Sequence, residues 1–160
     1  AGTDLSFAHI VVMKDSHRQP IAFMELMKIT QGKLSVFCNQ SQCYPYMQFG
    51  AAGCWSTEVW MGPWAVLYLL EQGRKGDDQK AIEAIDDLIG DGSGGRPVPG
   101  AGNKRPAEFA DYCKVGPTRI PFVTFPETEL AKAKRRAAHW MKLNEKYRPL
   151  VEALRARSAA

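Results

Sequence analysis

The sequence predicts an α/β fold in which parallel strands alternate with helices, and two observations predict it. Between residues 8 and 90, short apolar runs alternate with segments whose apolar residues recur at helical spacing, in the order strand, helix, strand, helix, strand, helix. The first run, Ile10 to Met13, is continuous, which is typical of a parallel strand covered on both faces. Such an alternation favours βα units joined by right-handed crossovers.

The strands and the first two helices follow from local patterns. Apolar runs bounded by polar residues or glycine predict strands at residues 8–16, 33–39 and 53–60. Helical spacing predicts a helix that starts at Pro20 and closes at Gly32. A second, short helix is expected within residues 44–53, ending at Gly50.

The rest of the chain is predicted to be mostly helical. Two helices separated at Gly73 and Gly76 are expected between residues 60 and 90, then a glycine-rich loop without a phosphate-binding motif. A helix at 106–116, an extended linker and a long helix at 127–156 with a kink at Pro149 should follow. One stripe of the long helix is expected to pack: Leu130, Ala133, Lys134, Ala137, Trp140, Met141, Tyr147, Leu150, Val151 and Leu154.

The composition is that of a globular domain, since the 160 residues are 45% hydrophobic and 24% charged. No apolar run approaches the roughly 18 residues of a membrane helix, and the first residues lack a signal-peptide pattern. We therefore expect a soluble, cytoplasmic protein that does not bind a membrane.

Residues 127–160 hold nine basic and four acidic side chains. This basic segment could bind nucleic acid, but a solvated face of a packed helix is the preferred interpretation.

The cysteines and histidines do not form a metal-binding pattern. There are four cysteines and three histidines, no C-x-x-C occurs, and the histidines are scattered. Structural thiols and the absence of a metal site are therefore expected.

Polar and aromatic side chains follow all three predicted strands at their carboxyl ends. Lys14 ends the first apolar run, Cys38 and Asn39 follow the run Ser35–Phe37 in the second strand, and Trp55, Ser56 and Thr57 follow Gly53 and Cys54 in the third. Catalytic groups collect at this end of parallel strands. A lysine that is partly desolvated there favours its neutral amine, which can attack a carbonyl to form a Schiff base.

Each of these residues also has an ordinary structural interpretation. Lys14 could reach the surface or pair with Asp15 or Glu25, and on spacing alone that interpretation is preferred. Trp55 could belong to the core, and Asn39 could simply turn the chain.

Nearly the whole chain, and most clearly the run from His9 to Ser56, resembles the class I, pyruvate-type aldolases, the dihydrodipicolinate synthase and N-acetylneuraminate lyase superfamily. The run from Ile10 to Lys14 matches the I-V-G-x-K pattern of the Schiff-base lysine, with Val12 in place of the glycine, and residues 50–53 match a G-A-x-G pattern. Within that superfamily, SVFCNQ, YPY, AAGCWST, WMGP and YCKVGPTRIPF look most like the trans-o-hydroxybenzylidenepyruvate hydratase-aldolases.

The resemblance implies the C-terminal half of a (β/α)8 TIM barrel, strands six to eight with additional C-terminal helices. Residues 1–90 would form the last three βα units, 91–105 a Gly/Pro-rich loop, and 106–160 a helical extension packed on the barrel. A complete barrel has about 250 residues. The family takes a proton-shuttling tyrosine from its fifth strand and a carboxylate-binding motif from its second, so we expect the N-terminal half to be supplied elsewhere.

The resemblance also implies an activity, that of a lyase of aromatic degradation. Lys14 would form an imine with the 2-oxo group of an arylidene pyruvate, which is hydrated and cleaved to an aromatic aldehyde and pyruvate. Asn39, Trp55 and Ser56 would bind the substrate. No cofactor is required beyond the lysine imine, and a homo-oligomer, a tetramer in the family, is implied. The alternatives are another pyruvate-dependent lyase or synthase of this superfamily, or a noncatalytic half-barrel remnant.

Overall fold

The computed structural model describes residues 10–16, 19–30, 32–90, 104–121 and 123–158. The chain divides into two compact units, Ala1–Trp55 and Ser56–Ala160, and each is described by itself. Among the residues described, no helix has the length and apolar character needed to cross a membrane.

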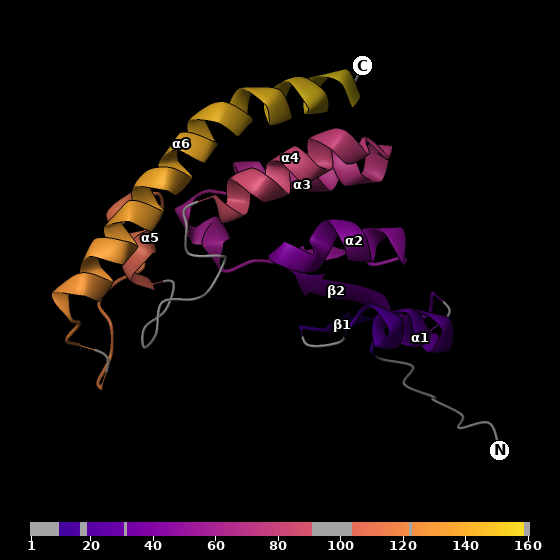
Figure 1. The fold of residues 1–160 in the computed structure, drawn as a ribbon, viewed down its shortest axis with the longest axis horizontal. Coiled ribbons are helices and arrows are strands. Elements are labelled where there is room, and N and C mark those ends of the chain that lie inside the picture. The colour runs from indigo at the N-terminus through magenta and orange to yellow at the C-terminus, as the bar shows by residue number, and fades with distance from the viewer. Residues whose placement is uncertain (1–9, 17–18, 31, 91–103, 122, 159–160) are drawn as a thin grey trace. The chain divides into compact units, whose positions relative to one another are not determined.

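The first unit is a parallel sheet with helical connections (Figure 1). Its elements, in chain order, are β1 Val12–Lys14, α1 Pro20–Thr30, β2 Ser35–Asn39, the 3-10 turn Gln40–Gln42, α2 Cys43–Gln48 and β3 Gly53–Trp55. Both strand pairs, β1 with β2 and β2 with β3, are parallel. The predicted α/β class with parallel strands is confirmed.

One face of this sheet is covered by helix. Val36 and Cys38 lie two residues apart in β2, so their side chains share a face, and both are fully buried. Helix α2 contacts both β2 and β3. Phe23 of α1 stacks on Tyr46 of α2 with ring centroids 4.3 Å apart. Burial of these apolar side chains drives the packing of the two helices, because it removes apolar surface from water.

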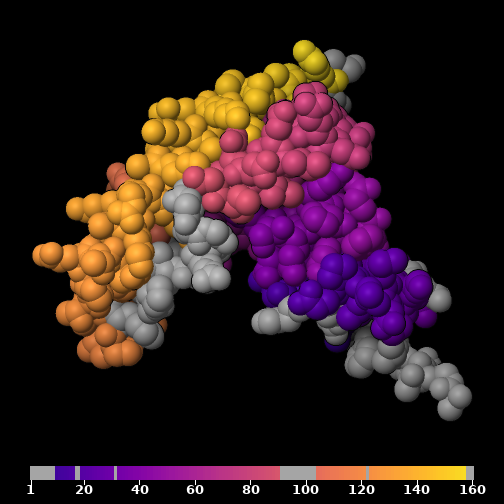
Figure 2. Space-filling model, viewed as in Figure 1, coloured from indigo at the N-terminus to yellow at the C-terminus, as the bar shows by residue number. Residues whose placement is uncertain are grey.

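The second unit is helical. It comprises the 3-10 turn Glu58–Met61, α3 Trp64–Lys75, α4 Asp78–Ile89, α5 Lys104–Ala110 and α6 Glu127–Ser158. Helix α6 contacts α5, α3 and α4, and Figure 2 shows the side chains of α3 and α4 directly against the C-terminal part of α6. Tyr68 of α3 and Tyr147 of α6 meet in its core with ring centroids 4.8 Å apart.

Several predicted boundaries are wrong, among them that of the first strand, which ends at Lys14 and does not reach residue 16. The third strand ends at Trp55 and does not reach residue 60, because Ser56 turns the chain by accepting a hydrogen bond from the Glu58 amide. Gly73 lies inside α3, and the break falls at Gly76, which has a φ of 71° and ends the helix in the left-handed conformation. Helix α5 starts at Lys104 and stops at Ala110, short of the predicted residue 116.

The buried stripe of α6 also differs from the prediction. Ala133, Ala137, Trp140, Tyr147 and Val151 are buried as expected. Lys134, Met141 and Leu150 are exposed, whereas the stripe also includes Arg136, Leu143 and Asn144. The helix is 32 residues long and contacts different neighbours along its length, so one straight stripe does not describe it. It continues through Pro149.

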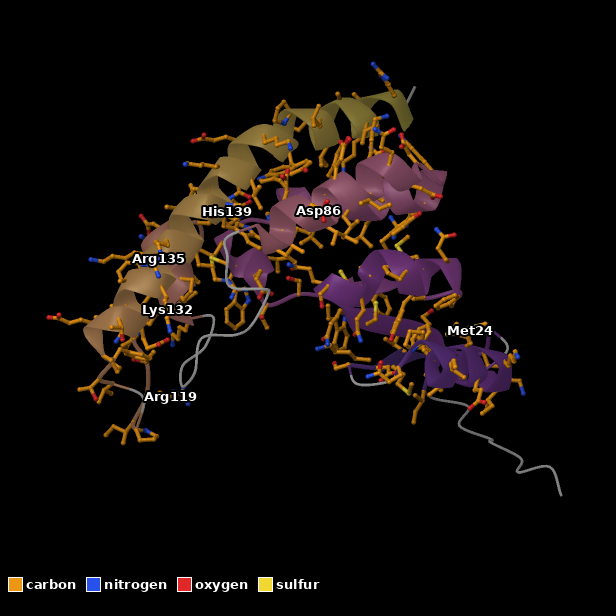
Figure 3. The ribbon with its side chains drawn as sticks, viewed as in Figure 1. Met24, Asp86, Arg119, Lys132, Arg135 and His139 are labelled. Atoms are coloured by element: carbon orange, nitrogen blue, oxygen red, sulfur yellow. The ribbon has the colours of Figure 1, made fainter. Side chains whose placement is uncertain are left out.

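The contacts of α3 and α4 can be compared with the predicted division of the chain at residue 90. Both helices pack with α6, so the described helices of the third βα unit group with the C-terminal ones. The predicted loop at 91–105 falls almost wholly outside the described residues, and the division at residue 90 stays a prediction. Apart from the buried Arg136, the lysine and arginine side chains of α6 are exposed, as Figure 3 shows for Lys132 and Arg135.

Candidate active site

Lys14, Phe37, Asn39 and Trp55 lie on one face of the sheet in the first unit. Lys14 is in register with Phe37 across β1 and β2, and Asn39 is in register with Trp55 across β2 and β3. Paired residues of neighbouring strands project to the same side, and residues two apart in a strand share a face. This is the face opposite Val36 and Cys38, so it is the one that α2 does not cover.

Lys14 is the last residue of β1, and its side chain is exposed. The next residue, Asp15, is buried, and its amide donates a 2.7 Å hydrogen bond to the Phe37 carbonyl. Lys14 makes no ion pair with any residue that the structure describes, so pairing with Asp15 or Glu25 is not found. Partial desolvation of Lys14 was expected from an opposite barrel wall; no element described in this unit forms such a wall, so this expectation stays a prediction.

Asn39 connects the ends of β1 and β2. It is the last residue of β2 and half-buried, and its side-chain Nδ2 donates a 3.0 Å hydrogen bond to the backbone carbonyl of Ser16. This bond holds the chain just after Lys14 beside the end of β2. It uses an amide proton, and the Asn39 carbonyl oxygen can accept a hydrogen bond from a ligand or a water.

Trp55 is not a core residue in this chain, because 55% of its surface is exposed. Its ring stacks against that of Phe37, with centroids 6.0 Å apart and an interplanar angle of 28°. Phe37 is half-buried and was not among the predicted site residues. Its position two residues before Asn39 in a strand was the signal that could have identified it.

Ser56 belongs to the second unit and has partners there. Its hydroxyl donates to Glu58 Oε2 at 3.1 Å and accepts from the Glu58 amide at 3.2 Å. Glu58 is in turn paired with Arg136 of α6 at 2.5 Å, and the two side chains are only 13% and 6% exposed. Arg136 was predicted to lie on a solvated face, so this buried ion pair was missed. The substrate-binding role of Ser56 stays a prediction.

The thiols of the first unit lie on the helix side of the sheet. Cys38 was considered for a pocket, but it is buried, and its Sγ donates to the Gly53 carbonyl at 3.4 Å. Hydrogen bonding with Cys38 and Cys54, followed by burial, raises the pKa of the Cys43 thiol. Hydrogen bonding with Cys43 lowers the pKa of the Cys38 thiol, and Cys38 lies on the sheet face opposite Lys14. Within the described ranges, no group of three cysteine, histidine or acidic side chains is arranged to hold a metal ion.

Comparison with known proteins shows a likeness in structure. No family model matches the chain, and no curated protein sequence matches it. Its structure is similar to a solved structure described as PhdJ bound to a substrate intermediate, with a TM-score of 0.70 and 20% sequence identity. The match covers 86% of this chain and 47% of the PhdJ chain, so this chain spans about half the length of PhdJ. Over most of its residues, the chain therefore has the fold of about half of PhdJ.

Proposed function

We propose that this chain carries the catalytic lysine of a class I hydratase-aldolase that cleaves an arylidene pyruvate to an aromatic aldehyde and pyruvate. The observation that carries the proposal is the position of Lys14. It ends β1 on an open sheet face, together with Asn39 and Trp55, in a fold similar to about half of PhdJ, whose structure was solved bound to a substrate intermediate. The carboxyl ends of parallel strands are where active sites of this architecture lie.

The chemistry begins with addition of the Lys14 amine to the 2-oxo carbon of the substrate. Loss of the carbonyl oxygen as water leaves an imine, and its protonated form withdraws electrons from the conjugated double bond. Water then adds across that double bond, its hydroxyl to the carbon that bears the aryl group and a proton to the neighbouring carbon, which restores the protonated imine; the hydroxyl proton is lost in the next step. Cleavage of the adjacent carbon–carbon bond releases the aromatic aldehyde and leaves an enamine, which takes up a proton. Hydrolysis of the resulting imine releases pyruvate and restores Lys14.

Asn39 and Trp55 have separate roles in this proposal. The Asn39 carbonyl oxygen would accept a hydrogen bond from the attacking water, while its amide holds the segment at Ser16. Trp55 would pack on the substrate, because its ring is exposed on the lysine side of the sheet. Ser56 follows Trp55 and would bind the substrate through its hydroxyl, which also contacts Glu58.

The N-terminal half of the barrel would complete this site and cover the open face. Exposed apolar side chains on two elements support that proposal: Ile10, Val11 and Val12 at β1, and Ile21, Met24 and Ile29 on α1 (Met24 in Figure 3). Strand β1 is also an edge of the described sheet, with backbone groups available for pairing. We propose that the missing strands dock here, and that the complete enzyme is a homo-oligomer.

Reductive trapping tests the proposal. The protein is purified natively, so that any polypeptide completing the barrel remains with it, and is incubated with pyruvate and borohydride. Hydride reduces the imine to a stable secondary amine, and we expect peptide mass analysis to locate it at Lys14. Lys28 and Lys33, exposed lysines of the same unit, serve as internal controls.

Two outcomes would contradict parts of the proposal. An unmodified Lys14, or equal labelling of Lys14 and Lys28, would exclude a Schiff-base site. Labelling at Lys14 without release of aldehyde from any arylidene pyruvate would instead favour another pyruvate-dependent lyase or synthase, or a noncatalytic remnant.

A further inference from the structure

Phe37 occupies the middle of the three-stranded sheet, between the lysine and the tryptophan. It is in register with Lys14 on one side, and its ring stacks on Trp55 on the other. Neighbouring strands lie about 4.8 Å apart. A group bound covalently to the Lys14 amine is therefore held on the same face of the sheet as the Phe37 ring, one strand away.

The two rings differ from the other aromatic side chains of this unit. Phe23 and Tyr46 stack in the buried layer between α1 and α2. Phe37 and Trp55 instead lie on the opposite side of the sheet, where Trp55 is more than half exposed. Exposed aromatic surface beside a reactive amine suits a flat apolar ligand, which would remove that surface from water and stack on the rings.

We propose that Phe37, together with Trp55, forms the surface that receives the aryl ring of the substrate imine, and that Phe37 determines specificity for aromatic over aliphatic 2-oxo acids. This inference rests on the proposed function, since it requires an imine at Lys14. The substrate class it names is a flat, conjugated aryl 2-oxo acid, because a planar ring can stack on the Phe37 and Trp55 rings.

The experiment compares two substrates in the natively purified protein. One is benzylidenepyruvate, and the other is an alkylidene pyruvate of similar length that lacks the ring. The ratio of their kcat/KM values is measured by the loss of enone absorbance, for the wild type and for Phe37→Leu. Trapping of pyruvate at Lys14 is measured in parallel as a readout of lysine chemistry.

We expect Phe37→Leu to lower the aryl-to-alkyl ratio by about three- to tenfold, the range of an aromatic pair contact, with pyruvate still trapped at Lys14. Phe37→Tyr keeps the ring and should keep the ratio. The matched control is Phe49→Leu. Phe49 is also half-buried, but its ring lies on the helix side of the sheet, with its centroid 6.1 Å from that of the Tyr46 ring. Phe49→Leu should leave the ratio unchanged.

The outcomes separate the two proposals. If the wild type shows no adduct at Lys14, the proposed function fails. If pyruvate is trapped but Phe37→Leu leaves the ratio unchanged, or Phe49→Leu lowers it equally, the role of Phe37 is overturned. Should Phe37→Leu not fold, Phe37→Met replaces it, because the unbranched side chain fills space adaptably without supplying a ring.

Discussion

The side-chain amide of Asn39 donates a 3.0 Å hydrogen bond to the backbone carbonyl of Ser16, two residues beyond Lys14. The bond runs from the end of β2 to the segment that follows β1. It therefore restrains the chain on which the candidate nucleophile lies, with a side chain that also faces the same site.

Replacing Asn39 by alanine should weaken both stability and lysine chemistry. Loss of the bond to Ser16 should cost about 1 kcal/mol of the free energy of unfolding, and the less restrained segment should slow reductive trapping at Lys14. Chemical denaturation and the rate of adduct formation measure the two effects. Gln48→Ala, at an exposed position of α2, is the control. Wild-type values for Asn39→Ala in both measurements would contradict the restraint.

The ion pair between Glu58 and Arg136 should contribute far more to stability than an exposed pair. Arg136→Ala leaves the Glu58 carboxylate buried without its cation, which should cost roughly 3–5 kcal/mol. The control is Arg148→Ala, whose pair with Glu152 at 2.9 Å is 63% and 54% exposed and should contribute at most about 1 kcal/mol. Guanidinium denaturation compares the two variants. If both variants lost the same free energy of unfolding, burial of the Glu58–Arg136 pair would have no effect on stability.

Stability should fall at acidic pH in part through Asp87. Burial alone would raise the pKa of its carboxyl, but hydrogen bonds of 2.6 Å each from Lys146 and Tyr147 outweigh burial and lower it. Because the folded pKa is below the unfolded one, this stabilisation is complete above the unfolded pKa, and it is lost as the pH falls through the folded pKa.

Denaturation midpoints between about pH 6 and about pH 3 test this coupling. Asp87→Asn should flatten the pH dependence, since the remaining side chain does not titrate. The neighbouring Asp86, which is exposed on α4 (Figure 3), provides the matched substitution, and Asp86→Asn should keep the wild-type slope. Identical slopes for the two variants would exclude a specific role for Asp87.

Gly62 should tolerate no side chain. Its φ is 121°, and an added Cβ would lie 2.3 Å from the Asn144 side chain, whose Nδ2 donates a 2.6 Å hydrogen bond to the Met61 carbonyl. Gly62→Ala should therefore destabilise the fold by roughly 2–5 kcal/mol, through backbone strain and overpacking together.

Gly76→Ala separates these two causes. Gly76 also has a positive φ, 71°, but nothing lies within 4 Å of an added Cβ, so only the backbone cost of about 1–2 kcal/mol remains. Thermal unfolding of both variants is the measurement. A larger loss for Gly76→Ala than for Gly62→Ala would contradict the predicted clash with Asn144.

The sequence by itself determined the parallel α/β character of the first unit and the placing of Lys14, Asn39 and Trp55 at strand ends. These are local properties, because the period of an apolar run and its order along the chain do not depend on distant residues. The same period could have placed Phe37 on the site face and Cys38 on the other, since strand side chains alternate.

Only the tertiary structure decided the burial of Arg136, the short third strand and the path of the buried stripe on α6. Within its own helix, Arg136 is one of several basic residues and looks solvated. It is buried because Glu58, 78 positions away, supplies the opposite charge. The strand stops at Trp55 for a related reason, because the residues that follow bind Glu58 and, through it, α6. Periodicity assigns a residue to a side of its element, whereas the partner that covers that side comes from elsewhere in the chain.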